Sequence, residues 1–382
     1  MIGGSVMTKK DLYKEATKDM IVGLEEIERS INMQVEDKRT HRKKKYRMSR
    51  VAAAIIVGML TVSTVSVSAY ALHHWSNGMK GRFQVSSSDT ASLEKTGVAD
   101  FPDEKKETKS VTKNGVTVSV VQTLVDNYYA YIAFQVKGYQ IGKKETPTFD
   151  HMKCTLDGKM VSTCSSFYDG LSNDGNGNVI MGDGSALSTG KDISLVNSYV
   201  QKDGTLEYHI LMYTDGTRGY FSNKTVNIKL SDLGIYGKKE EVKVEKKGTW
   251  SFAWKLSGSS ASKVKKVNAT LGNTGVVVSE CEVSPISLRA VIDTSNKKKG
   301  TMSKDVDYPP ITGVKLKDGT VLTCIIGGGI EEHDKDGRWE AIFATSRIID
   351  VDEVESFLFD KSSRNDGEEY TEDNFYEVPI NQ

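Results

Sequence analysis

The chain is poor in the residues and motifs that mark catalytic and metal sites. It has only four cysteines and six histidines in 382 residues, and no two cysteines have the CxxC spacing of metal or redox sites. The sequence contains neither an HExxH zinc motif nor a GxSxG nucleophile elbow. The glycine run Gly327–Gly329 lacks the Lys-Ser/Thr that completes a phosphate-binding loop. We therefore expect no enzyme, no cofactor and no metal site.

The chain also lacks net charge. Its 51 basic residues balance 51 acidic ones, so no overall field attracts nucleic acid, and we expect no direct nucleic-acid partner. The balance hides a difference between segments. Residues 1–50 carry 13 Lys/Arg against 8 Asp/Glu, and the remaining residues carry 38 against 43. Such asymmetry suggests that the two segments face different environments.

One long apolar run stands out, from Val51 to Leu72. It has 22 residues and no charge, and as a helix it would span about 33 Å, enough for a hydrocarbon core of about 30 Å. Trp75 marks its far end, as interfacial aromatic residues do. A dense basic cluster precedes the run and includes Arg42, Lys43, Lys44, Lys45, Arg47 and Arg50. The lipid bilayer is therefore a predicted partner, and this cluster with Val51, Leu72 and Trp75 forms the predicted anchor.

The basic flank also predicts orientation. By the positive-inside rule the N-terminus lies in the cytoplasm, and residues after the span lie outside a plasma membrane crossed once. A cleaved signal peptide is the alternative, since Ala69-Tyr70-Ala71 resembles a cleavage site. A lead of fifty residues and a 22-residue core are too long for that interpretation. Ala54 and Gly58 have the small-xxx-small spacing that permits a weak homodimer through the span.

The cytoplasmic segment has a helical pattern. Apolar residues recur at intervals of three or four and form one face: Leu12, Ala16, Met20, Leu24, Ile27, Ile31 and Val35. Two interpretations stay open. The helix lies on the anionic inner leaflet beside the basic cluster, or it places its apolar face in the groove of a partner protein.

After the span the sequence predicts a mainly β protein. Six prolines, 34 glycines and 16 tyrosines fit strands joined by turns better than a helical bundle. Many short strands separated by Asp-Gly or Asp-Asn turns are typical of β-sandwiches, and we predict two immunoglobulin-like sandwiches in tandem. The predicted strands are Val116–Leu124, Tyr128–Val136, Met152–Leu156, Met160–Ser165, Leu206–Tyr213, Val226–Leu230, Val242–Glu245, Trp250–Leu256, Val264–Leu271, Val276–Val283, Leu288–Ile292, Val314–Leu316, Val321–Ile326, Glu340–Thr345 and Val354–Phe359.

These patterns divide the chain into six segments. We expect a large loop between Phe167 and Asn197, where Gly, Asn, Asp and Ser dominate. The predicted segments are a cytoplasmic helix and basic anchor (1–50), a transmembrane helix (51–72), a juxtamembrane linker (73–110), a first sandwich (111–256), a second sandwich (263–360) and a loose acidic tail (361–382).

The cysteines and one acidic loop could have a special role, but each also has a simpler structural interpretation. Cys154 and Cys164 flank the Asp157-Gly158 turn, and a disulfide between them stays open because a tight hairpin would place Cys154 opposite residue 161 or 162. Cys281 and Cys324 are interpreted as small buried thiols. Asp174, Asn176 and Asn178 resemble a calcium loop, but Val179 and Ser185 stand where an EF-hand needs Gly and Glu. A solvated loop is favoured there.

Five segments stand out by their order and spacing. They are KKKYRMSRVAAAIIVGML at residues 43–60, NGVTVSVVQTLVDNYYAYIAF at 114–134, GTWSFAWKL at 248–256, VVVSECEVSPISLRAVID at 276–293 and IIDVDEVESFLF at 348–359. Together they resemble the family of Gram-positive membrane proteins catalogued as domain of unknown function 4179. The resemblance implies a short cytoplasmic helix, one span and a β ectodomain. It also implies a membrane-bound anti-sigma regulator whose partner is an extracytoplasmic-function sigma factor.

Three functions follow as hypotheses. The first is a transmembrane sensor whose ectodomain responds to an envelope signal and whose N-terminal helix binds the sigma factor. The second is an anchored extracellular binding or adhesion module with no signalling role. The third, an envelope hydrolase, would need convergent titratable groups in a cleft, and no motif supports it.

Overall fold

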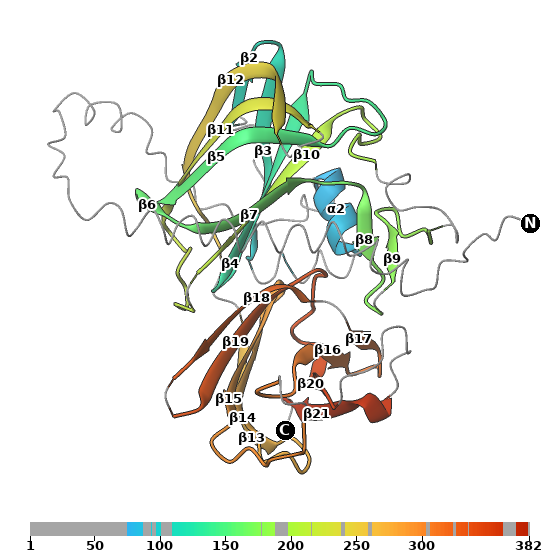
Figure 1. Ribbon diagram of the computed structural model, residues 1–382, viewed down its shortest axis with the longest axis vertical. Helices are drawn as coiled ribbons and strands as arrows, with labels where there is room; N and C mark the ends of the chain where they lie inside the picture. The colour runs from blue at the N-terminus through green and yellow to red at the C-terminus, as the bar shows by residue number, and fades with distance from the viewer. Residues whose placement is uncertain are drawn as a thin grey trace, which may run out of the picture. The chain divides into compact units, whose positions relative to one another are not determined.

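The protein is mainly β. The computed structural model describes residues 75–86, 93, 97–100, 109–176, 178–187, 198–214, 216–237, 241–258, 262–302, 306–323, 326–334, 336–361 and 372–380, all of which belong to one compact unit. Antiparallel sheets form most of this unit, and helix α2 (Asn77–Phe83) precedes them (Figure 1). None of its described helices is long and apolar enough to cross a membrane. The predicted span and the predicted N-terminal helix lie outside the described residues.

Two sheets enclose the first hydrophobic core. One has the order β1-β3-β4-β10-β7 with β2 added on β3, and the other has the order β12-β11-β5-β6. We call these two sheets the first sheet pair. Their strands are β1 (Ala99–Asp100), β2 (Ser110–Lys113), β3 (Val116–Val125), β4 (Tyr129–Lys137), β5 (Pro147–Leu156), β6 (Lys159–Met160), β7 (Ser162–Phe167), β10 (Leu206–Tyr213), β11 (Thr225–Tyr236) and β12 (Val242–Lys255).

Two further sheets enclose a second core. Their orders are β13-β14-β15-β19-β18 and β17-β16-β20-β21, and we call them the second sheet pair. The strands are β13 (Lys263–Thr270), β14 (Val277–Val283), β15 (Ser287–Asp293), β16 (Ile311–Leu316), β17 (Val321–Thr323), β18 (Ile326–His333), β19 (Arg338–Thr345), β20 (Val354–Asp360) and β21 (Phe375–Pro379), and a short 3-10 helix η3 (Glu372–Asn374) precedes β21.

The cores follow from the alternation of apolar residues along the strands. In the first half of β3, Val116, Val118 and Val120 are buried, whereas the residues between them are partly exposed, because successive side chains point to opposite faces of a sheet. These valines meet Trp250 and Phe252 of β12 in one cluster. A separate cluster joins both sheets of the second pair.

Most strand predictions are confirmed, and the differences have physical reasons. Residues 242–255 form one strand where two were expected, because β12 continues past Gly248 alongside β11 through a bulge. The expected strand Val321–Ile326 is instead two elements, β17 and β18, in different sheets.

Elements also occur where a large loop, a loose tail and a linker were expected. The expected loop at 167–197 holds a hairpin of β8 (Leu171–Asn173) and β9 (Val179–Met181). The expected loose tail holds β21, which pairs with β20 and buries Phe375 and Val378. The expected linker holds α2. Each element is seven residues or shorter, too short for periodicity to reveal.

Candidate functional site

Helix α2 begins five residues after the predicted membrane span and is built into the β structure. Ser76 caps its N-terminus, with the side chain accepting a hydrogen bond from Met79 N. Gln84 ends it in the left-handed conformation (φ 48°). Gly78, Met79, Gly81 and Phe83 are buried. A helix of seven residues is not stable alone, so its packing decides whether it forms.

Two glycines let α2 approach the sheet. A Cβ on Gly78 would lie 2.6 Å from the carboxyl carbon of Glu207, and a Cβ on Gly81 would lie 2.4 Å from the Tyr168 hydroxyl oxygen. Glycine lowers helix propensity by about 1 kcal/mol relative to alanine. Contact with the sheet offsets that cost. The two glycines therefore favour packing of α2 at this position over stability of the isolated helix.

Glu207 of β10 holds the start of the helix. The residue is 3% exposed, and its carboxylate accepts hydrogen bonds from Ser76 Oγ (2.6 Å), Gly78 N (2.9 Å) and Met79 N (3.0 Å). A negative charge at a helix N-terminus is also favoured by the helix dipole. Burial raises the pKa of Glu207, but the hydrogen bonds from His209, Ser76 and Gly78 outweigh it and hold the pKa below its usual value. The helix is therefore tied to an ionised, buried carboxylate.

His209 completes this arrangement from the same strand. Its Nε2 lies 2.8 Å from Glu207 Oε1, and because the carboxylate accepts, Nε2 is the protonated nitrogen. Its Nδ1 is buried and has no hydrogen-bond partner in the described structure. The ring stacks on Tyr168, with centroids 5.6 Å apart. Burial lowers the pKa of His209, and the hydrogen bond to Glu207 opposes this only in part. His209 is thus held neutral.

This neutral histidine makes stability depend on pH. Because the pKa of His209 is lower in the folded chain than its ordinary 6.5, the unfolded chain binds more protons just below pH 6.5, and stability falls as pH drops through that range. We expect His209→Gln, which keeps a donor for Glu207, to flatten the fall in urea midpoint between pH 7.5 and 5.5. The exposed His151→Gln should keep the native slope. Equal slopes in both variants would refute the assignment.

The β8–β9 hairpin connects α2 with the second sheet pair. On one side Ser172 Oγ donates to Arg82 O (2.8 Å), and Gln84 Nε2 donates to Gly182 O (3.1 Å). On the other side Asn173 Nδ2 donates to Ser346 Oγ (2.8 Å), and Thr323 N donates to Gly175 O (2.7 Å). Helix α2 and β8 lie side by side (Figure 1). The hairpin is a polar bridge from the helix to both β17 and the end of β19.

A third hydrophobic cluster joins helix α2 to strands of both sheet pairs. We use the name α2 junction for this cluster together with α2 and the polar contacts of α2 described above. Met79 and Phe83 from the helix meet β3 and β4, and the Phe83 ring packs edge-on against Tyr131 with centroids 5.0 Å apart. Ile342 and Ala344 of β19 belong to the same cluster. Burying a large apolar side chain contributes about 1.5–3 kcal/mol. Burial of Met79 and Phe83 therefore stabilises the packed helix by several kcal/mol.

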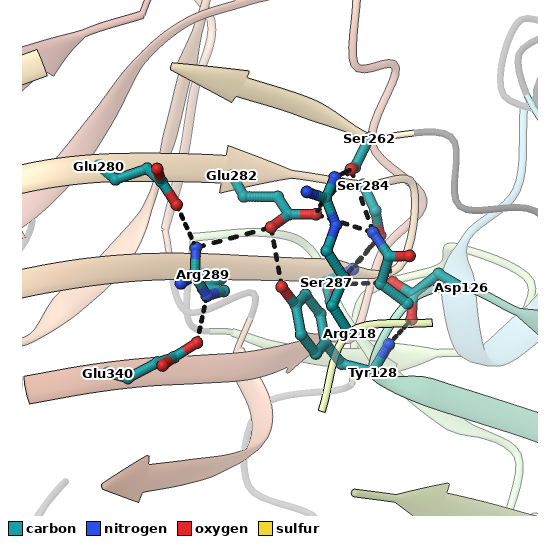
Figure 2. A network of polar contacts seen from close by, with 11 residues as sticks. Asp126, Tyr128, Arg218, Ser262, Glu280, Glu282, Ser284, Ser287, Arg289 and Glu340 are labelled. Atoms are coloured by element: carbon teal, nitrogen blue, oxygen red, sulfur yellow. Dashed lines mark hydrogen bonds and ion pairs between the residues drawn. The ribbon is translucent and has the colours of Figure 1, made fainter. Parts of the chain in front are cut away.

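A buried carboxylate joins the two sheet pairs. Asp126, in the turn between β3 and β4, is fully buried. Its Oδ1 accepts from the backbone N–H groups of Tyr128 and Tyr129 (2.8 Å each). Its Oδ2 accepts from the hydroxyl of Ser284, in the turn after β14, and from that of Ser287, the first residue of β15. Figure 2 shows these two turns meeting. Burial raises the pKa of Asp126 against the opposing effect of its four donors.

Charged side chains extend this junction along the second sheet pair. Glu282 is 2% exposed and accepts from Tyr128 Oη and Asn127 Nδ2, each at 2.8 Å. Arg289 lies beside it and contacts Glu280 and Glu340 as well (Figure 2). Arg218 reaches Glu282 at 3.2 Å from the first sheet pair. The polar groups of Asp126 and Glu282 are paired across the junction, which is what a fixed interface requires.

The functional residues predicted from the sequence are not those of the α2 junction. Of the predicted anchor residues only Trp75 is described, and it packs against the α2 junction cluster. The other anchor residues and the whole apolar face Leu12–Val35 lie outside the described residues, so those assignments stay predictions. Sequence reasoning missed Glu207 and His209, which are two residues apart on a strand and look like ordinary polar strand residues. Only Asp126 carried a signal, as a turn residue.

The structure places Cys154, Cys164 and the calcium-like loop, whereas Cys324 lies outside the described residues. Cys154 and Cys164 lie on strands of different sheets and are not joined by a disulfide. Burial raises the pKa of the Cys154 thiol to about 12. Asp174 accepts hydrogen bonds from Asn176 N and from Asn178 N and Nδ2. No cluster of three or more metal-binding side chains occurs in the described residues.

Comparisons with known proteins find a family that matches part of the chain. Residues 41–138 match the family described as "Domain of unknown function (DUF4179)", which confirms the resemblance over those residues. This match includes the predicted span, α2, β3 and β4. A solved structure described as the crystal structure of the conserved domain protein from Bacillus anthracis aligns at 13% identity and a TM-score of 0.38, covering 65% of this chain and 74% of that one. No curated protein matches the chain.

Proposed function

We propose that the chain is a single-pass membrane regulator. The premise is that residues 41–138 match a family of unknown function. In this proposal residues 51–72 span the plasma membrane and residues 1–50 lie in the cytoplasm. Outside, residues 111–256 and 263–360 form two immunoglobulin-like sandwiches. The face from Leu12 to Val35 binds an extracytoplasmic-function sigma factor, so the protein acts as an anti-sigma factor and not as an enzyme.

The observation that carries this proposal is the position of α2. The segment that leaves the predicted span contacts β10 through Glu207, β8 through Ser172 and the second sheet pair through the cluster with Ile342. An anchor that only tethers an adhesive module would need no such contacts, because a flexible linker serves that purpose.

The contacts suggest how a signal would travel. A ligand that changes the arrangement of the two sheet pairs would change the contacts of α2. A two-state element of this kind would let an external site influence an internal one. We propose that docked α2 corresponds to the state that holds the sigma factor. Release of α2 corresponds to the signalled state.

The test is recovery of the sigma factor with the full chain from membranes. We expect an extracytoplasmic-function sigma factor to copurify with the native chain, and Leu24→Asp with Ile27→Asp to reduce its recovery about tenfold or more, because charges on the apolar face disrupt groove binding. The matched control is Lys14→Gln with Lys18→Gln on the charged face. Recovery of no sigma factor, with no transcriptional change on deletion of the chain, would contradict the proposal and favour the adhesion module.

A further inference from the structure

One end of the first sheet pair carries an excess of positive charge. Three segments meet there: the turn between β2 and β3, the connection from β4 to β5, and the hairpin of β11 and β12. Asn114 Nδ2 donates to Lys247 O, Tyr139 Oη donates to Glu245 Oε2 (3.1 Å), and Tyr236 N donates to Thr146 O (3.0 Å). Strands β2 and β12 lie side by side there (Figure 1). These contacts join segments up to 133 residues apart.

We call this region the basic end, and lysine dominates it. Its described charges are Lys113, Lys137, Lys143, Lys144, Lys243, Lys246 and Lys247 against Glu145, Asp232, Glu241 and Glu245. Seven positive and four negative groups give a net charge of +3, in a chain whose overall formal charge is zero. All the lysines except Lys246 are exposed. The excess is therefore presented to solvent.

The carboxylates at this end are mostly occupied by local partners. Glu245 pairs with Lys243 Nζ at 2.9 Å and also accepts from Tyr139. Glu145 accepts from Gly142 N, and Asp232 accepts from Gly248 N. Five lysines form no ion pair with any described residue: Lys113, Lys137, Lys143, Lys144 and Lys247. These five are the groups available to a partner.

We propose that the basic end binds a flexible chain of phosphate groups. The five lysines are spread over three segments and form no enclosed site, which suits an extended polyanion better than one small anion. Lysine ammonium groups bind phosphate as mobile point charges and suit a flexible backbone. Protein interfaces need apolar or aromatic anchors, and Tyr236 is the one large apolar side chain found strongly exposed among the described residues of this end. The same scarcity of aromatic residues disfavours single-stranded nucleic acid, whose bases need stacking partners.

The basic end is separate from the α2 junction. Strand β3 runs from Val116 beside the basic end to Val125 beside Asp126, and ten residues of strand extend about 33 Å. Binding at the basic end therefore does not rest on the proposed signalling role. A failure of one proposal leaves the other standing.

The test uses the full chain in a neutral detergent and inorganic polyphosphate about one hundred phosphates long. We expect binding that weakens roughly a hundredfold between 50 and 200 mM salt, as the release of about five counterions predicts. The variant Lys113→Gln/Lys137→Gln/Lys143→Gln/Lys144→Gln should weaken binding about tenfold or more at 150 mM salt. The matched control is Lys266→Gln/Lys298→Gln/Lys299→Gln/Lys317→Gln. These lysines are exposed, lie on β13 and in the connections that follow β15 and β16, and give the same loss of charge.

Each outcome decides the proposal. Equal weakening in both variants would show a general charge effect and overturn the site, and so would unchanged binding in the first variant. Tighter binding to a single-stranded oligonucleotide of equal charge, or to anionic phospholipid vesicles alone, would overturn the choice of partner. A measurement on the native chain needs no variant: bound polyphosphate should protect Lys143 and Lys144, but not Lys266, from acetylation.

Discussion

Replacing Glu207 with alanine is expected to free helix α2 and to lower the free energy of unfolding by about 3 kcal/mol or more, because several buried donors lose their acceptor and each unsatisfied buried group costs about 1–3 kcal/mol. The variant leaves the N–H groups of Gly78 and Met79 without their acceptor. It also removes the carboxylate from His209 Nε2. The loss therefore combines unpaired donors with lost packing around the helix.

Urea unfolding and hydrogen exchange measure this effect together. In the Glu207→Ala chain the amides of Gly78 and Met79 should exchange as fast as in an unfolded segment, while the strands of the second sheet pair stay protected. Glu241→Ala is the matched control, because Glu241 is exposed and surface changes usually stay within about 0.5 kcal/mol. Native protection at Gly78 in the Glu207→Ala chain would refute the role given to Glu207.

Asp126→Ala is expected to cost about 3 kcal/mol or more, because four donors lose their acceptor inside the protein and each unsatisfied buried group costs about 1–3 kcal/mol. Asp126→Asn should cost much less. The asparagine Oδ1 can still accept from Tyr128 and Tyr129, and the Ser284 and Ser287 hydroxyls can turn to accept from its amide. The difference between the two variants isolates the hydrogen bonds from the volume of the side chain.

The same alanine variant should also separate the unfolding of the two sheet pairs. Trp250 and Trp254 of β12 belong to the first core, and Trp339 of β19 packs on the second. Hydrogen exchange of the β12 amides therefore reports unfolding of the first core, and exchange of the β19 amides reports unfolding of the second. We expect one shared transition in the native chain and two in Asp126→Ala. A single transition with an unchanged midpoint would show that Asp126 does not couple the sheet pairs.

Local patterns in the sequence predicted much of the β structure. The sequence predicts the strand pair around Asp126-Asn127 because two strand-like runs, Val116–Leu124 and Tyr128–Val136, flank a two-residue turn of hairpin type. Leu206–Tyr213 matches β10 at both ends. These signals lie within ten residues of one another, and for that reason a single sequence reveals them.

The candidate site was not predictable in the same way. Glu207 meets Ser76 across 131 residues, and Asp126 meets Ser284 across 158, so no local spacing records either contact. Helix α2 has two glycines in seven residues, a composition that indicates a loop until the close approach to Glu207 and Tyr168 is known. Polar residues that serve a buried junction look the same in sequence as polar residues on a surface.

In our proposal, the docking of α2 outside the membrane governs binding of a partner inside it. The decisive measurement is recovery of the sigma factor with the full chain from membranes, compared between Glu207→Ala and Glu241→Ala. We expect Glu207→Ala to lose the partner several-fold, although its cytoplasmic segment is unchanged and its second sheet pair remains protected from exchange. Equal recovery with the two variants, under conditions where the Gly78 and Met79 amides exchange freely in Glu207→Ala, would contradict it.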